Sequence, residues 1–157
     1  MLVQLLAAAV LSSAILNADL LADSGHTFIT ADSSKRRIAI IGADGKTKWE
    51  HKIGPLHDLH VLDNGNILFQ TSWTRLVEVD PETDKVVWEY DSATSNGNKG
   101  KRIEVHAFQR LANGATMIAE SGASRIIEVD KKGKLLKTVP LKVSKPHPHR
   151  DTRLARK

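Results

Sequence analysis

Apolar and polar residues alternate in three segments of the chain that align with one another. They begin at Arg37, Arg75 and Arg125. Each segment opens with an alternating apolar run, as expected of a half-buried strand. A polar turn follows, and a lysine then starts a second alternating run. Each copy therefore predicts a β-hairpin, over residues 37–51, 75–90 and 125–139.

A second hairpin pattern precedes the last two copies, over residues 57–69 and 106–118. Asn64-Gly65 and Asn113-Gly114 occupy the same place in this pattern. Asn-Gly is a strong hairpin signal, because both residues of a two-residue turn take a positive φ. The first copy shows only the second half of the pattern, Thr27–Ala31.

A full unit of the repeat thus has four strands. Successive copies start 38 and 50 residues apart, and most of the difference is the segment Ser92–Glu104, which we expect to be a long exposed loop. Four strands in roughly 40–45 residues is the pattern of a propeller blade. We predict an all-β fold of antiparallel four-stranded blades, about three units of an incomplete β-propeller. A β-sandwich is the alternative, since short strands alone permit it.

The first sixteen residues are apolar and carry no charge, and the small-residue stretch Asn17-Ala18-Asp19 follows. That length is typical of a secretory signal and short for a membrane span. The alternative is a buried helix or a first strand. We expect an export signal over 1–18, no membrane span in the mature chain, and a periplasmic or extracellular location. The partial propeller then covers 19–157, with units at 26–53, 54–104 and 105–148 and the start of a further unit at 149–157.

The number of units is low for a closed ring, because propellers have four to eight blades. An open array would leave strand edges and blade faces uncovered. We therefore expect the chain to be a fragment of a larger propeller, or to self-associate through its open blade edges.

Composition removes several function classes. The 157 residues include no cysteine, which excludes disulfides, thiolate zinc sites and a cysteine nucleophile. Lysine and arginine number 23 against 18 acidic residues, and the excess lies within 141–157. Nucleic-acid binding needs a basic stripe across a folded surface, so we expect no nucleic-acid partner.

The segment RLVEVDPETDKVVWEY resembles the repeat of pyrroloquinoline-quinone-like (PQQ-like) propellers. Units that begin His-Asp-Leu-His and end Trp-Glu also resemble exported bacterial propellers grouped with arylsulfotransferase-like proteins. The resemblance covers Thr27 to the C-terminus. It implies that Trp49 and Trp88 pack between neighbouring blades. The third copy has Lys137 in that position.

Five of the seven histidines lie near the starts of units. If His57 and His106 begin the innermost strands of two blades, both imidazoles face one channel. Imidazole exchanges protons near neutral pH and can serve as acid, base or nucleophile. The alternative is that each histidine caps a strand within its own blade. The resemblance to arylsulfotransferase-like enzymes implies a histidine as sulfate acceptor, with His57 or His106 as candidates and Arg150 as an anion clamp.

Four further residues are candidates for ligand binding: His60, Trp73, His147 and His149. Trp73 lies at a strand end, where an indole could stack on a ligand. His147 and His149 would face one side of an extended chain, and with Asp151 they could supply part of a zinc shell. A solvated connector is the alternative, and we expect no metal.

We also expect no cofactor, because Trp49 and Trp88 suit packing better than the floor of a quinone site. Glu78 and Glu128 align between copies, and we expect both on a solvated strand face.

The sequence favours an exported β-propeller domain that binds an unidentified ligand or protein partner through its channel face and loops. The sequence does not decide whether this chain is an enzyme, although it favours a chain without catalytic activity. One alternative is an arylsulfotransferase-like enzyme with channel histidines. A second is a fragment of a quinone-dependent dehydrogenase.

Overall fold

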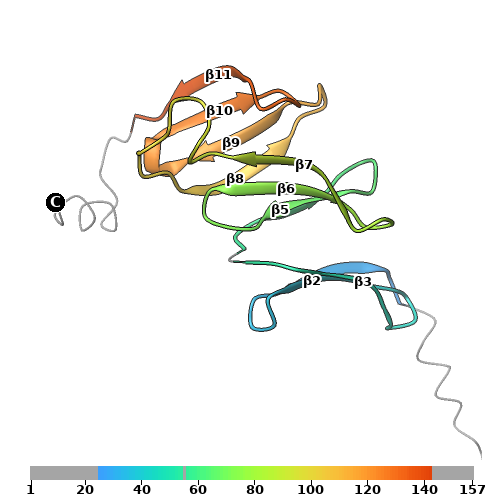
Figure 1. Cartoon of the computed structure of the whole chain (residues 1–157). Coiled ribbons are helices and arrows are strands. Elements are labelled where there is room, and N and C mark those ends of the chain that lie inside the picture. The colour runs from blue at the N-terminus through green and yellow to red at the C-terminus, as the bar shows by residue number, and fades with distance from the viewer. Residues whose placement is uncertain (1–24, 55, 143–157) are drawn as a thin grey trace, which may run out of the picture.

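The computed structural model describes residues 25–54 and 56–142, which form three antiparallel sheets stacked in chain order (Figure 1). The first sheet contains β1 (Phe28–Asp32), β2 (Arg37–Ile41) and β3 (Thr47–Lys52). The second contains β4 (Leu59–Val61), β5 (Ile67–Gln70), β6 (Arg75–Asp80) and β7 (Lys85–Asp91). The third contains β8 (Val105–Arg110), β9 (Thr116–Glu120), β10 (Arg125–Val129) and β11 (Leu135–Pro140), with a short 3-10 helix, η2 (Ser121–Ala123), between β9 and β10. Neighbouring strands in each sheet are consecutive in sequence. The fold is the predicted one, an incomplete propeller of about three blades.

The turns that follow Gly42, Leu62, Leu111 and Asp130 share one geometry. After β4, Leu62 N donates to Asn66 O and Gly65 N donates to Leu62 O, both at 2.8 Å. Of the two residues Asn64 and Gly65, only Gly65 has a positive φ, +83°. This is a three-residue turn that ends in a left-handed residue. The hairpin was predicted, but the two-residue turn with two positive φ angles was wrong.

The core lies between the sheets. Successive side chains of a strand point to opposite faces, so a central blade can pack on both sides. Along β5, Ile67 and Phe69 belong to an apolar cluster shared with the first sheet, and Leu68 belongs to one shared with the third. All four residues of β5 are buried. The second sheet therefore joins the other two.

The outer strand of each of the first two blades also contacts a turn of the next blade. Trp49 Nε1 donates to Asp84 Oδ1 at 3.0 Å, and Trp88 Nε1 donates to the Lys131 carbonyl at 3.1 Å. The predicted packing of both indoles between neighbouring blades is confirmed. In the third blade, Lys137 Nζ instead lies 3.5 Å from Glu128 Oε1.

The segment between β7 and β8 is anchored rather than fully exposed. Ser92, Asn98 and Ile103 are at most 5% exposed. Asn98 Nδ2 donates to the Ser92 carbonyl and to Glu120 Oε1, at 2.8 and 2.9 Å. Arg125 donates to the buried Glu120 carboxylate at 2.6 Å and to Asn98 Oδ1 at 2.8 Å. The prediction of a long exposed loop was wrong at these positions, because a buried charge needs partners and the loop provides one.

The predicted export signal (1–18) and the predicted start of a further unit (149–157) lie outside the described residues. Within the described part of the chain, no helix has the length and apolar character to cross a membrane.

Candidate functional site

Three rings from two blades converge at one place. His57 lies in the connection that precedes β4, Trp73 lies between β5 and β6, and His106 is the second residue of β8. The His57 and Trp73 ring centroids are 4.3 Å apart, the two imidazoles 5.4 Å, and Trp73 and His106 5.9 Å. We call His57, Trp73 and His106 the ring cluster. Trp73 lies in the turn that joins β5 to β6, whereas the two histidines lie just before β4 and at the start of β8.

A buried glutamine positions the ring cluster. Gln70 is 0% exposed, and its Nε2 donates to the Val105 carbonyl at 2.7 Å while its Oε1 accepts from His57 N at 3.2 Å. Val105 N also donates to the Trp73 carbonyl at 2.8 Å. The connection that carries His57 and the strand that carries His106 are thereby tied to the second blade. Sequence reasoning missed Gln70, whose only signal is an amide at the end of the apolar run Ile67–Phe69.

The ring cluster is open to solvent and bordered by charge. Trp73 is 46% exposed, and both histidines are exposed. Glu104 Oε2 lies 3.6 Å from His106 Nε2, and Arg102 Nη2 lies 2.9 Å from Glu104 Oε1. The site thus offers a flat apolar surface, two imidazoles and an adjacent ion pair. Such groups can stack on a planar molecule and exchange hydrogen bonds with its polar atoms.

The remaining predicted site residues do not join the ring cluster. His60, on β4, has its Nε2 3.1 Å from Asp58 Oδ2, and its ring meets the edge of Phe108 at 5.3 Å. His147, His149 and Arg150 lie outside the described residues. Among the residues that the structure describes, no group of three or more histidine, aspartate or glutamate side chains could hold a metal ion.

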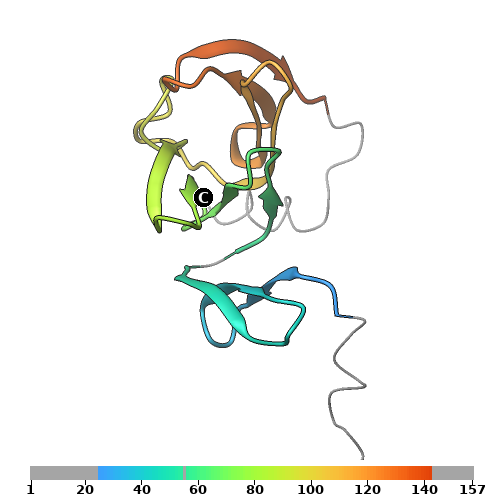
Figure 2. The same ribbon diagram turned by 90° about the vertical axis from the view of Figure 1, so that its right-hand side faces the viewer.

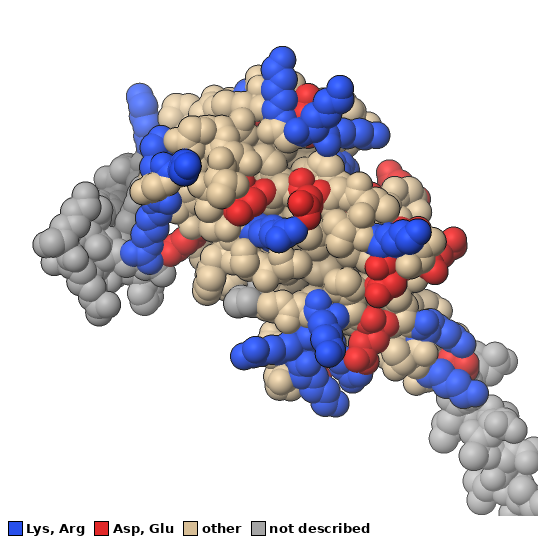
Figure 3. Space-filling view, in the orientation of Figure 1, with Lys and Arg blue, Asp and Glu red and all other residues tan. Residues whose placement is uncertain are grey.

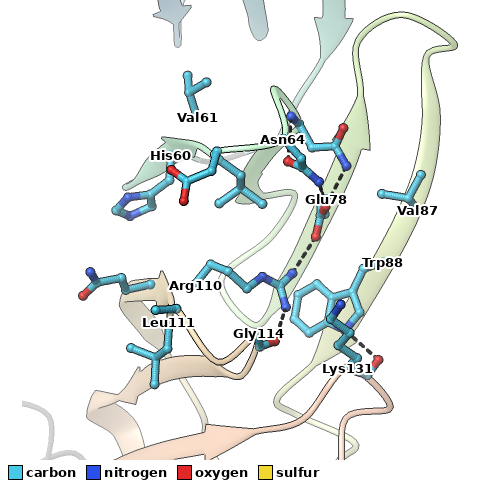
Figure 4. Close-up of a pocket in the computed structure, with 15 residues that line it drawn as sticks. His60, Val61, Asn64, Glu78, Val87, Trp88, Arg110, Leu111, Gly114 and Lys131 are labelled. Carbon is cyan, nitrogen blue, oxygen red and sulfur yellow. Dashed lines mark hydrogen bonds and ion pairs between the residues drawn. The ribbon is translucent and has the colours of Figure 1, made fainter.

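His60 instead lines a pocket of about 870 Å³ between the second and third blades, near the hairpin turns (Figure 4). Its centre is Arg110, whose Nη2 lies 2.6 Å from Glu78 Oε2 and whose guanidinium lies 4.6 Å from the Trp88 ring centroid. Asn66 Nδ2 donates to Glu78 Oε1 at 2.7 Å.

Glu78 is only 8% exposed, so the predicted solvated position was wrong for this residue. Its charge is balanced by the arginine of the next blade. Because these polar groups pair within the protein, we interpret Arg110, Glu78 and Trp88 as a contact that joins two blades.

Comparison with known proteins gives structural neighbours only. Neither a protein-family model nor a curated protein matches the sequence. The WD40 β-propeller domain of Doa1 is 21% identical, with a TM-score of 0.57 over 77% of this chain and 38% of that one. A catalytically inactive histidine-to-alanine variant of virginiamycin B lyase from Staphylococcus aureus, solved with quinupristin, is 17% identical, with a TM-score of 0.53 over 76% and 42%. BBS1N in complex with ARL6DN is 10% identical, with a TM-score of 0.52 over 80% and 38%.

These neighbours establish a β-propeller fold. The chain spans about two fifths of the length of each of them. The narrower PQQ-like and arylsulfotransferase-like classes stay predictions.

Proposed function

We propose that this chain is a β-propeller binding domain whose ligand or partner contacts the ring cluster. The observation that carries the proposal is the convergence of three exposed rings from two adjacent blades. With the apolar, uncharged segment 1–16, the proposal includes a role outside the cytoplasm.

The ring cluster suits a planar aromatic ligand that carries an acidic group. Stacking on the exposed Trp73 indole supplies affinity, and an aromatic pair contributes about 0.5–1.5 kcal/mol beyond its buried area. The nitrogens of His57 and His106 can donate hydrogen bonds to the acidic group. The neighbouring virginiamycin B lyase structure contains quinupristin, which supports small-molecule binding as a use of this fold.

The proximity of the two imidazoles supports a second candidate, an arylsulfotransferase-like enzyme. One imidazole nitrogen would attack the sulfur of an aryl sulfate, which forms an N–S bond and breaks the S–O bond to the departing phenolate. The inactive histidine-to-alanine variant of the neighbouring lyase favours catalytic use of histidine on this fold. Trp49 and Trp88 are engaged between blades, so the quinone-dependent alternative gains no support.

The test uses p-nitrophenyl sulfate as the probe, with the affinity measured by calorimetry. We expect wild-type chain to bind it and Trp73→Ala to bind at least about tenfold more weakly, because the stacking surface is lost. His26→Ala, which alters a histidine outside the ring cluster, should bind like wild type. If Trp73→Ala and the double variant His57→Ala/His106→Ala both bind the probe as tightly as wild type, the proposal is contradicted.

The same mixtures separate binding from catalysis. Release of p-nitrophenolate that requires His57 or His106 would establish the enzymatic candidate. Binding without release would support the binding domain alone.

A further inference from the structure

The outer face of the third blade carries apolar side chains with no described sheet against them. The third sheet ends the row of blades in both views (Figures 1 and 2). Its other face packs on the second sheet through Ile118 and Ile127, which are buried. Because strand side chains alternate, the outer face presents the intervening residues, among them Met117, Ile126 and Val139. Val139 is 40% exposed.

The register of β10 and β11 gives this face an internal symmetry. Ile126 lies opposite Val139, and Glu128 lies opposite Lys137. Each pair places one member on β10 and the other on β11. The first pair is apolar, and the second joins opposite charges 3.5 Å apart whose side chains are 24% and 62% exposed.

Such a face is complementary to itself. A two-fold axis that runs between β10 and β11, parallel to the strands, places β10 of one copy over β11 of the other. Glu128 of each copy then faces Lys137 of the other, and Ile126 faces Val139. Closed pairs of identical subunits use this kind of isologous contact.

The second blade shows how a face built for another blade differs. There Glu78, at the repeat position of Glu128, receives Arg110 from the next blade, and Trp88 donates to that blade's turn. In the third blade Lys137 takes the place of the tryptophan and supplies a positive charge from its own strand. The tryptophan anchor of the second blade's contact does not recur, and the carboxylate that would receive an arginine already has Lys137 of its own blade as a partner. Both differences favour a second copy of this chain over a further blade of the same type. Basic side chains with acidic ones among them also gather over the third sheet (Figure 3).

We propose that the outer face of the third blade, centred on Ile126, Glu128, Lys137 and Val139, is a homodimer interface. This interface is independent of the proposed ligand site, because the ring cluster lies on other elements than β10 and β11.

The test is the mass of the full chain in solution, measured by light scattering over a concentration series. We expect twice 17.3 kDa for wild type. Glu128→Lys or Lys137→Glu alone places like charges opposite one another and should weaken dimerisation at least about tenfold. The double variant Glu128→Lys/Lys137→Glu restores opposite charges and should restore the dimer. Lys85→Glu, on the second blade, is the matched control.

Each contrary result is distinct. The proposal is overturned if wild type is monomeric. It is also overturned if neither single charge reversal weakens the dimer, or if the double variant stays monomeric. Circular dichroism identifies any variant that fails to fold. Val139→Arg is a second test variant, and we expect it to be monomeric. Its exposed position tolerates arginine in the monomer, whereas the charge blocks the apolar contact between copies.

Discussion

At the scale of single residues, the arginine that opens each repeat has a carboxylate partner in every copy, but not the same one. In the first two copies the partner follows the interblade tryptophan: Arg37 pairs with Glu50, and Arg75 pairs with Glu89. In the third copy Arg125 pairs with the buried Glu120, which also holds Asn98. Exposed pairs contribute about 0–1 kcal/mol, whereas removal of one member of a buried pair costs about 3–5 kcal/mol. One repeat residue therefore has a surface role twice and a loop-anchoring role once.

Asp84 links the first two blades through a titratable group. Its Oδ1 lies 2.9 Å from His51 Nδ1 and 3.0 Å from Trp49 Nε1. The hydrogen bond with His51, and then that with Trp49, lowers the pKa of the Asp84 carboxyl from 3.8. A carboxyl group whose pKa is lowered in the folded state stabilises the fold at pH values above its ordinary pKa. This contribution disappears as the pH falls through the lowered pKa.

We therefore predict that acid weakens the contact between the first two blades. Asp84→Asn should be less stable than wild type at neutral pH, and the difference should shrink as the pH falls below 3.8. Thermal unfolding measured across that pH range, with tryptophan fluorescence as the signal, tests this. Asp63→Asn, on a neighbouring exposed turn, is the control. A difference between Asp84→Asn and wild type that does not change with pH would contradict the assignment.

At the scale of elements, the hairpin turns determine where each strand ends. Gly65, with φ +83°, is the left-handed residue of the turn between β4 and β5. In the turn between β6 and β7, Asp84 takes the left-handed position with φ +53°. Asparagine and aspartate tolerate this conformation better than other residues with a side chain.

Gly65 offers a direct test of that requirement. Gly65→Ala should lower the free energy of unfolding by about 1–2 kcal/mol, because alanine is strained in the left-handed region. Gly65→Asn should cost less, since asparagine adopts this conformation more readily. Urea denaturation of the three proteins measures both changes. Equal losses for the two substitutions would show that the backbone conformation is not the cause.

At the scale of the whole molecule, stability depends on contacts between blades. Both apolar clusters include residues of the second blade, which packs on its two neighbours. Each interface adds polar anchors: Asp84 with Trp49 and His51 on one side, and Trp88 with Lys131 and Arg110 on the other. A repeat array of this kind gains its stability from nearest-neighbour interfaces as well as from each unit.

Trp88→Phe should therefore weaken the coupling between the second and third blades. It removes the hydrogen bond to the Lys131 carbonyl and weakens the contact with the Arg110 guanidinium. We expect a loss of about 1–2 kcal/mol in the free energy of unfolding. Trp73→Phe makes the same chemical change at a half-exposed position and should change stability by no more than about 0.5 kcal/mol. Similar losses in both variants, compared by urea denaturation, would argue against an interblade role for Trp88.

The sequence by itself determined the strands, their hairpin order and the four-stranded unit. These features depend on alternation within a strand and on recurrence between copies, and both are visible in a single chain. The packing of Trp49 and Trp88 between blades was instead implied by the resemblance to PQQ-like propellers. The alignment of His57 with His106, together with the choice of Trp73 as a stacking candidate, also named all three members of the ring cluster before their positions were known.

Only the tertiary structure decided which polar side chains are partners. Glu78 and Glu128 align, but Glu78 is buried against Arg110 and Glu128 lies on the outer face. The roles of Gln70 and Asn98 are likewise absent from the repeat pattern. An alignment assigns equivalent positions the same environment, whereas a buried polar group takes its partner from whichever neighbouring blade or loop lies within hydrogen-bond distance. That neighbour is set by the packing of the blades and not by the period of the strands.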